Sequence, residues 1–300
     1  MIDIFIPSYK RSDNLKTLIF FKKIGYDVSR IHIFIDSEAE DKREYEETIN
    51  QAGANLFVFN MEEARTRYDY VHRASVSRRS AGQARNMFYD YAKKKGIDFY
   101  MVQDDDTLGY EIKKMGRYKR MATINDILNI FSGIKFMMIE RKIGCFGTPQ
   151  TGDFIGGTSK GLLINKVMNT TFILTKYIYR GEKGVQDNDT SQFVGIMNEG
   201  FFTGSLGDGL CLKQTPSATA KGGLTELYNE CKLLNKSLIL PIQFPSLSHA
   251  ERQIKNGGRL HHSIKSKNLF PKLLKVNHGR DNIAWDSYKE DYPFTCEPKR

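Results

Sequence analysis

Cysteine is scarce in this 300-residue chain, and long apolar runs are absent. The four cysteines lie far apart and form no CxxC pair: Cys145, Cys211, Cys231 and Cys296. This spacing argues against disulfides and Cys-ligated zinc, and it indicates free thiols in a reducing compartment. No stretch approaches the roughly 20 apolar residues that a bilayer-spanning helix needs, and Met1-Ile2-Asp3 begins a strand rather than a signal peptide. We therefore expect a cytoplasmic protein with no membrane partner.

Acidic residues are outnumbered by basic ones, because 35 Asp and Glu stand against 45 Lys and Arg, a formal net charge of +10. Two basic clusters stand out: Arg65, Arg67, Arg73, Arg78 and Arg79 form the first, and Lys113, Lys114, Arg117, Lys119 and Arg120 form the second. Tyrosines are interleaved with both clusters, and basic residues continue through 252–275. Such clusters suit the phosphate backbone of a nucleic acid, and the tyrosines could stack on its bases. The alternative is a solvated basic surface.

Short apolar runs alternate with helical patterns along the first 110 residues. Strands are predicted at 2–6, 31–35, 56–59 and 99–102, and helices from a cap at Ser12 or Asp13 to Gly25, over 41–51, and from Gly82 to Gly96. Alternation of this kind is typical of an α/β protein, with a mostly parallel sheet flanked by helices. The length and the 40% hydrophobic content fit one such domain with an elaborated C-terminal lobe.

The tripeptide Asp104-Asp105-Asp106 directly follows the last of these predicted strands. If the segment stays extended, Asp104 and Asp106 share one side and Asp105 turns away. Like charges this close repel one another unless a cation or hydrogen-bond donors compensate them. A divalent ion that holds a diphosphate is one compensation, and a solvated acidic turn or a helix cap is the alternative.

Polar residues also follow the first two predicted strands, where Pro7-Ser8-Tyr9 and Asp36 occur. In open parallel sheets, ligands bind at the carboxyl ends of the strands. We therefore expect these residues to converge with the three aspartates.

The segments 6–11 (IPSYKR), 34–37 (FIDS), 82–86 (GQARN) and 102–106 (VQDDD) together resemble the donor half of GT-A glycosyltransferases, which use nucleotide-diphosphate sugars. Further along, 155–161, 186–189, 199–203 and 221–224 look similar to the TET-associated glycosyltransferases of phages, which glycosylate hydroxymethylated pyrimidines in DNA. The resemblance implies a GT-A (Rossmann-like) fold. It divides the chain into a glycosyltransferase domain over 1–240, with a donor half (1–110) and an acceptor half (111–240), and a basic extension over 241–300.

By this resemblance, the protein would transfer a sugar, with UDP as the expected carrier, to 5-hydroxymethylcytosine in double-stranded DNA of a phage-infected cell. A glycan, lipid or protein acceptor is the alternative. A catalytically silent nucleic-acid-binding protein on the same scaffold is the third possibility.

The resemblance also implies roles for particular residues. Donor binding would fall to Pro7, Ser8, Tyr9, Arg11, Asp36, Arg85, Asp104, Asp105 and Lys221. A divalent metal, Mn²⁺ or Mg²⁺, would be held by Asp106, Asp104 and His249. DNA would be contacted by Arg78, Arg79, Lys119 and Arg120.

An acceptor hydroxyl needs a base beside the sugar's anomeric carbon. In 186–189, Asp187 is the first candidate and Asp189 the second. Gln186 stands where many inverting GT-A enzymes carry the first acid of a pair, a departure from that pattern. Asp189 also suits the N-cap of a helix over 190–198, which would leave Asp187 free.

Overall fold

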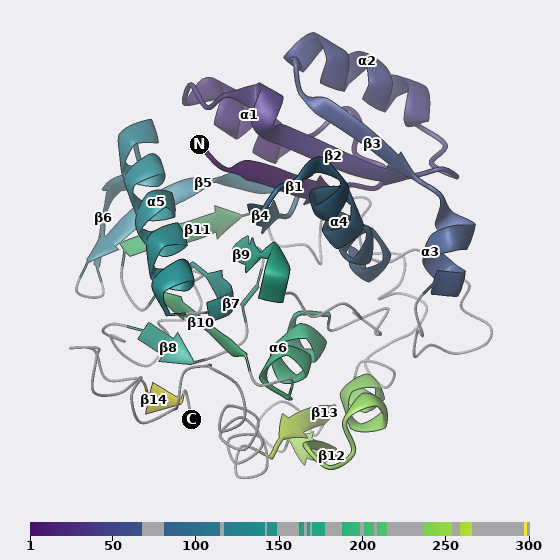
Figure 1. Cartoon of the computed structure of the whole chain (residues 1–300), viewed down its shortest axis with the longest axis vertical. Coiled ribbons are helices and arrows are strands. Elements are labelled where there is room, and N and C mark those ends of the chain that lie inside the picture. Colours follow the sequence, from purple (N-terminus) through teal and green to yellow (C-terminus); the bar gives the residue numbers. More distant parts are fainter. Residues whose placement is uncertain are drawn as a thin grey trace.

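The computed structural model describes residues 1–67, 81–114, 117–141, 143–148, 162–164, 167–168, 170–177, 188–198, 201–206, 209–214, 237–253, 259–265 and 297–298. A nine-stranded sheet runs through them in the order β14-β8-β10-β7-β9-β4-β1-β2-β3 (Figure 1). Its strands are β1 (Asp3–Pro7), β2 (Ile31–Asp36), β3 (Asn55–Phe59), β4 (Phe99–Gln103), β7 (Ile143–Gly147), β8 (Leu162–Ile164), β9 (Thr170–Leu174), β10 (Phe202–Leu206) and β14 (Glu297–Pro298).

Four strands from the first 103 residues form a continuous parallel unit. β1 pairs in parallel with both β2 and β4, and β2 pairs in parallel with β3. The helices that connect them are α1 (Lys16–Lys23), α2 (Lys42–Ala52), α3 (Met61–Arg67) and α4 (Ala81–Lys95), with a 3-10 turn η1 (Val28–Arg30). The predicted α/β class and the predicted strand order along the chain are confirmed here.

β9 is antiparallel to both of its neighbours, β4 and β7, and β10 runs parallel to β7. β4, β7 and β10 consequently point the same way, so their carboxyl ends share one edge of the sheet with those of β1 and β2. We call this the carboxyl edge, and the opposite one the amino edge. The sheet is mostly parallel, as predicted; β9 inside it and β8 and β14 at its edge run the other way.

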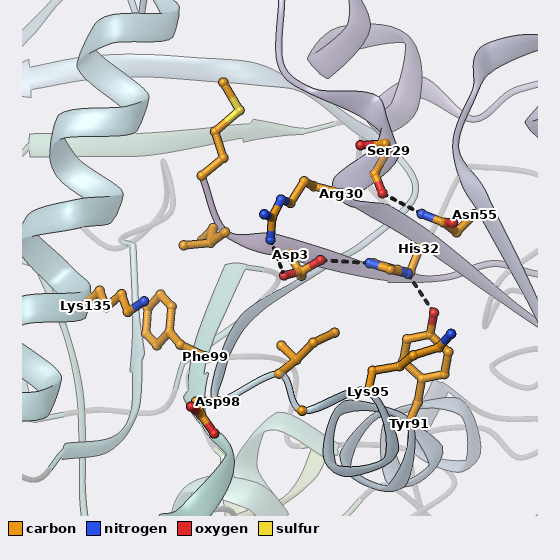
Figure 2. A pocket seen from close by; sticks show the side chains of 14 residues that line it. Asp3, Ser29, Arg30, His32, Asn55, Tyr91, Lys95, Asp98, Phe99 and Lys135 are labelled. Carbon is orange, nitrogen blue, oxygen red and sulfur yellow. Dashed lines mark hydrogen bonds and ion pairs between the residues drawn. The ribbon is translucent and has the colours of Figure 1, made fainter.

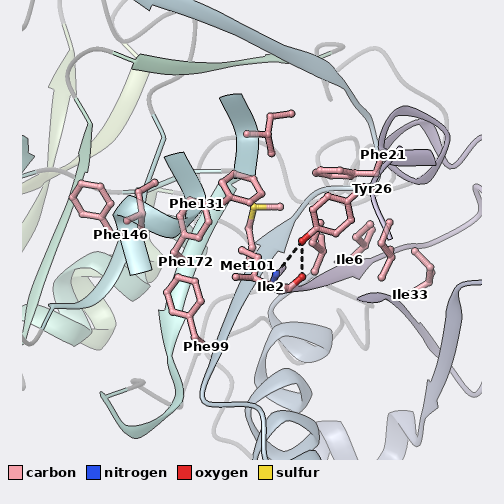
Figure 3. Packing of buried hydrophobic residues seen from close by; sticks show 14 of the residues in the cluster. Ile2, Ile6, Phe21, Tyr26, Ile33, Phe99, Met101, Phe131, Phe146 and Phe172 are labelled. Atoms are coloured by element: carbon pink, nitrogen blue, oxygen red, sulfur yellow. Dashed lines mark hydrogen bonds between the residues drawn. The ribbon is translucent and has the colours of Figure 1, made fainter. Parts of the chain in front are cut away.

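Alternate residues of the strands belong to two hydrophobic clusters, one on each face of the sheet. Ile4 and Ile6 of β1 lie in the larger cluster, whereas Phe5 lies in the other. This follows from the two-residue period of a strand. The larger cluster, part of which Figure 3 shows, contains apolar side chains of α1, α2 and α5 (Ile124–Glu140). The smaller one contains those of α3 and α4. Burial on both faces explains why the strands read as near-continuous apolar runs.

Two smaller sheets complete the described part. β5 (Thr107–Lys114) lies between β6 (Arg117–Met121) and β11 (Gly209–Gln214), and β12 (Ser248–Gln253) pairs with β13 (Arg259–Ile264). The remaining elements are the 3-10 turn η3 (Thr175–Tyr177), α6 (Asn188–Asn198) and a short helix over 237–243. None of the described helices is long and apolar enough to span a bilayer.

Helix ends agree with the sequence only in part. Gly25 lies two residues after the end of α1 and Gly96 directly after α4, both with positive φ (82° and 67°), as predicted for glycine stops. The predicted cap of α1 at Ser12 or Asp13 is wrong, because the helix begins at Lys16 and its N-cap position, Leu15, has no side-chain cap. Cys145 is buried and free, as expected, whereas the side chains of the other three cysteines lie outside the described residues.

Candidate active site

The three aspartates form the turn from β4 into β5 at the carboxyl edge. β4 ends at Gln103, one residue before Asp104, so the aspartates are not extended. The predicted orientation is wrong for Asp105, which is 5% exposed. Arg11 Nη1 contacts both Asp105 and Asp106, so Asp105 does not turn away from Asp106. A turn has no two-residue period, and this is why the strand argument failed at this point.

Asp105 is the most tightly held of the three. It accepts a hydrogen bond from Ser8 Oγ at 2.6 Å and forms a short ion pair with the Arg11 guanidinium. Burial raises the pKa of Asp105, although Arg11 and Ser8 act against that rise. Both oxygens of this carboxylate are occupied by protein donors.

Asp106 is compensated far less. It is 4% exposed, Arg11 Nη1 lies 3.4 Å from its Oδ2, and its buried Oδ1 has no hydrogen-bond partner among the described residues. Burial raises the pKa of Asp106 to about 7, with further contributions from the charges of Asp104 and Asp105 and opposition from Arg11. An unpaired buried carboxylate oxygen is what a hard divalent cation would occupy, so these residues fit such an ion.

Asp104 faces the start of α4. Its Oδ1 accepts a hydrogen bond from Arg85 Nη2 at 3.0 Å, and both side chains remain partly exposed, 27% for Asp104 and 17% for Arg85. This ion pair joins Arg85 of α4 to the aspartate turn.

The backbone of the turn is fixed by the start of α1. Thr17 Oγ1 donates to the carbonyl of Asp104 at 2.5 Å, and Thr17 N donates to the carbonyl of Asp105 at 3.1 Å. The same Oγ1 accepts from Thr107 N at 2.9 Å. Thr17 was not singled out from the sequence, where a threonine inside an amphipathic helix gives no functional signal.

The loop after β1 supplies the groups that meet the turn. Pro7 pairs with Phe34 in the register of β1 and β2, and Ser8 N donates to the carbonyl of Phe34 at 3.0 Å. Tyr45 of α2 contacts this loop from the core: its hydroxyl lies 2.7 Å from Ser8 Oγ and accepts from Arg11 N at 3.0 Å. Sequence reasoning missed Tyr45, since a tyrosine on the apolar face of a helix normally reads as core.

Beneath the turn, a buried polar network joins three strands. Gln103 Oε1 accepts from Tyr110 Oη at 2.6 Å and from Thr170 Oγ1 at 2.7 Å, and Gln103 Nε2 donates to Thr107 Oγ1 at 2.5 Å. Gln103, Thr107, Tyr110 and Thr170 are each 0% exposed. Hydrogen-bond networks in which every group has a partner rigidify a core, so this network fixes the position of the end of β4, which carries the aspartates.

Asp36 ends β2 at the same edge and is 4% exposed. Its Oδ1 accepts a hydrogen bond from Glu38 N at 2.8 Å, a local contact in the turn that follows β2. Tyr9 lies in the same loop as Ser8 and Arg11, with Lys10 Nζ 5.3 Å from the centre of its ring. The structure thus brings Ser8, Arg11 and Arg85 into contact with the aspartates and places Pro7, Tyr9 and Asp36 along their edge.

Asp189, the second candidate base, belongs to α6. Because the helix begins at Asn188, Asp189 is in its first turn, and the predicted N-cap role of Asp189 is wrong. α6 leads into β10 through a short connection and packs on that strand, so its first turn points toward the carboxyl edge. Asp187, Lys221, Arg78 and Arg79 lie outside the described residues.

Two other predicted residues have partners of their own. His249 lies on β12, 46% exposed, with Nε2 3.4 Å from Glu251 Oε2. Arg120 of β6 pairs with both oxygens of Asp126 at 2.6 and 2.8 Å, and Asp126 in turn completes the capping box of α5. In the part of the chain that the structure describes, no three His, Cys, Asp or Glu side chains gather as a metal site, so His249 as third ligand stays a prediction. Lys119 is on the same strand, but its side chain is outside the described residues.

A cavity of about 510 Å³ opens at the amino edge, away from the aspartate turn (Figure 2). Asp3, at the start of β1, bonds His32 Nε2 at 2.9 Å and Arg30 at 3.1 Å, and His32 Nδ1 lies 2.9 Å from Tyr91 Oη. The predicted donor residues are on the other edge.

The fold and this edge define an α/β protein with a carboxylate site at the ends of parallel strands. Residues 2–202 match the family model of the TET-Associated Glycosyltransferase. The match spans more than half of the chain, so this protein belongs to that family and is a glycosyltransferase.

Similar solved structures are distant. One is the mannosyltransferase PcManGT from Pyrobaculum calidifontis in complex with GDP-Man and Mn²⁺, with 10% identity, TM-score 0.47, and coverage of 73% of this chain and 58% of that one. Another is glucosyl-3-phosphoglycerate synthase from Mycobacterium tuberculosis in complex with Mn²⁺, UDP and glucosyl-3-phosphoglycerate, with 8% identity, TM-score 0.44, and coverage of 88% and 87%. This chain thus spans little over half the length of the first of them. No curated protein matches the chain.

Proposed function

We propose that this glycosyltransferase takes its sugar from a nucleotide-diphosphate donor, with UDP as the expected carrier, and that it requires Mn²⁺ or Mg²⁺. The observation that carries the proposal is the buried, unpaired Oδ1 of Asp106 beside Arg11. Asp106 and Asp104 would hold the cation, which neutralises charge on the departing diphosphate when bound. Both similar structures named above contain Mn²⁺ with a nucleotide or nucleotide sugar, which agrees with this proposal.

Other residues are proposed to bind the nucleoside and the diphosphate of the donor. Arg85 lies beside Asp104, where its guanidinium can bind a phosphate in a forked geometry. Ser8, Tyr9 and Asp36, along the same edge, are proposed to hold the nucleoside, together with Pro7. Lys221 is proposed to contact the diphosphate from the acceptor half.

The acceptor is proposed to be the hydroxymethyl group of 5-hydroxymethylcytosine in phage DNA, in the cytoplasm of the infected cell. The family name and the excess of basic residues support it. In the chemical step, the acceptor oxygen bonds to the anomeric carbon while the bond from that carbon to the diphosphate breaks. The diphosphate keeps the electron pair, and Asp187 accepts the hydroxyl proton, with Asp189 as second candidate.

Duplex DNA must present that hydroxymethyl group to a site at the edge of a sheet. In stacked DNA the group lies in the major groove, so we expect the nucleotide to be flipped out, which costs a few kcal/mol. Contacts of Arg78, Arg79 and Lys119 with phosphates would offset this cost. Arg120 is a weaker candidate because Asp126 already occupies its guanidinium.

Transfer assays decide among the acceptors. Labelled UDP-sugars and other nucleotide sugars are incubated with hydroxymethylcytosine DNA, unmodified DNA and a panel of glycans, each with Mn²⁺ and with EDTA. Label on the modified DNA alone, lost in EDTA, is the expected result. Label on a glycan instead would replace the acceptor, and transfer that EDTA leaves intact would remove the metal from the proposal.

DNA binding is tested separately. A variant with Arg78, Arg79 and Lys119 changed to Glu should bind hydroxymethylated duplex more weakly and with a shallower salt dependence, while its affinity for the nucleotide sugar is unchanged. An unaltered salt slope would transfer the footprint to the basic C-terminal residues.

A further inference from the structure

We infer that Tyr45 is a positioning residue for the metal site: through Ser8 and Arg11 it keeps Asp105 bound to the protein and leaves Asp106 for the cation. This inference rests on the proposed function. It assigns a role to α2, a helix that supplies none of the predicted site residues.

Tyr45 is 0% exposed and belongs to the larger hydrophobic cluster, yet its hydroxyl reaches out of that cluster to two groups of the β1 loop. Burial raises the pKa of Tyr45, so the hydroxyl stays protonated at neutral pH. It is therefore a neutral group that can donate one hydrogen bond and accept others.

The direction of the hydrogen bonds follows from counting protons. Ser8 has one hydroxyl proton and gives it to Asp105 Oδ2 at 2.6 Å. In the 2.7 Å contact between the two hydroxyls, Tyr45 must consequently be the donor. The result is a directed chain from Tyr45 through Ser8 to Asp105, while Arg11 N donates to the oxygen of Tyr45 at 3.0 Å.

These hydrogen bonds hold the loop between Ser8 and Arg11, whose backbone is not in a relaxed conformation. Lys10 has φ of 54°, which non-glycine residues seldom adopt. Tyr45 holds the loop on both sides of Lys10, at Ser8 and at the backbone of Arg11. The same Arg11 carries the guanidinium that pairs with Asp105 and reaches Asp106.

The division of labour among the aspartates follows from these contacts. Both oxygens of Asp105 are taken by Ser8 and Arg11, whereas one oxygen of Asp106 is left over. Without the Tyr45 hydroxyl, Ser8 loses a donor and Arg11 N loses its acceptor. The loop can then relax, and Asp105 becomes free to compete with Asp106 for the metal or to move Arg11 away.

The test compares Tyr45→Phe with Tyr26→Phe. Tyr26 is a matched control, because it is also buried in the larger cluster and its hydroxyl also has two partners, the carbonyl of Ile2 at 2.6 Å and the amide of Ile2 at 3.2 Å. Those partners are at the amino edge. A general loss of stability should therefore appear in both variants, and a change at the metal site only in one.

Two measurements are made on the full-length protein. Amide hydrogen exchange without metal should speed up about tenfold over 8–12 in Tyr45→Phe and over the first residues of β1 in Tyr26→Phe. Mn²⁺ binding, measured from the free-ion signal in electron paramagnetic resonance, should weaken about tenfold in Tyr45→Phe and stay at the wild-type value in Tyr26→Phe.

The outcomes separate this inference from the proposed function. Wild-type protein that binds no Mn²⁺ at all would refute the metal in the proposed function, whatever the exchange data show. Wild-type binding together with equal Mn²⁺ affinities in the two variants, or unchanged exchange over 8–12 in Tyr45→Phe, would overturn the role of Tyr45 alone.

Discussion

The aspartates at the two edges of the central sheet differ in how their carboxylates are paired and in the direction of their pKa shifts. At the amino edge, the carboxylate of Asp3 has His32 on one oxygen and Arg30 on the other, and these contacts bring its pKa below the usual value despite partial burial. At the carboxyl edge, three aspartates are adjacent, and burial raises the pKa of both Asp105 and Asp106.

The difference shows how a buried charge affects the stability of the fold and the binding of a ligand. Asp3 is compensated within the chain, so it contributes to stability and leaves nothing for a ligand. Asp106 is undercompensated, and such a carboxylate lowers stability until a cation arrives. The edge that is worse for folding is therefore the edge that suits binding, although the cavity described above lies at the other one.

Asp106→Asn should have the largest effect. Metal-dependent transfer is expected to fall about 10³-fold, because the side chain keeps its size but loses the charge that holds the cation. The unfolding temperature should stay the same or rise, since an undercompensated buried charge is removed. Steady-state kinetics measure the loss of transfer, and calorimetry measures the unfolding temperature. Near-normal turnover would remove Asp106 from the metal site.

Arg85→Gln should have the next largest effect at the carboxyl edge. The KM for the nucleotide sugar is expected to rise roughly tenfold to a hundredfold, with a smaller change in kcat, because a phosphate loses its charged partner. Titration calorimetry with the free nucleoside diphosphate measures binding directly. A normal affinity would make Arg85 only the partner of Asp104.

Asp3→Asn is the matching change at the amino edge. The loss of charged hydrogen bonds to His32 and Arg30 should cost about 1–3 kcal/mol and lower the unfolding temperature by several degrees. Donor KM and kcat should not change, because this carboxylate belongs to the other edge. A large kinetic effect would show that the two edges are coupled.

The last expected effect is on the pH dependence of stability, and its sign differs between the edges. In metal-free protein, Asp106 binds its proton more tightly when folded (pKa about 7) than the ordinary value of 3.8 allows, so stability declines as pH rises from about 4 to about 7. The pKa of Asp3 is lowered, so its contribution is present above 3.8 and is lost as pH falls below that value.

Urea unfolding in EDTA across this range tests the two signs. Asp106→Asn should remove the decline toward neutral pH, and Asp3→Asn should flatten the loss in acid. The same slope in both variants and in the wild type would contradict the assignment of these two titrations to the two edges.

The parallel half of the sheet could be predicted from the sequence because each of its strands is locally visible. Short apolar runs end in turn residues, and glycines stop the helices, so β1 to β4, α2 and α4 were found near their observed positions. The meeting of Ser8 with the aspartates also followed, since carboxyl ends of parallel strands share an edge.

What the sequence did not reveal depends on contacts between distant segments. Asp105 faces inward because Ser8 and Arg11 lie opposite, and no local pattern reports that. Tyr45 and Thr17 act on the site from helix positions that read as core. The antiparallel placement of β9 is set by its pairing with β4 and β7 rather than by its composition.

The network at Gln103 bears on when the site can form during synthesis. β1 to β4 come from the first 103 residues, a contiguous segment that can begin to fold as soon as it leaves the ribosome. The hydrogen bond from Thr170 of β9 to Gln103 Oε1, however, forms only when a residue 67 positions later in the chain arrives. Until then Gln103 has only its nearer partners, Thr107 and Tyr110, so a nascent chain acquires its first four strands before the polar network beneath the aspartate turn is complete.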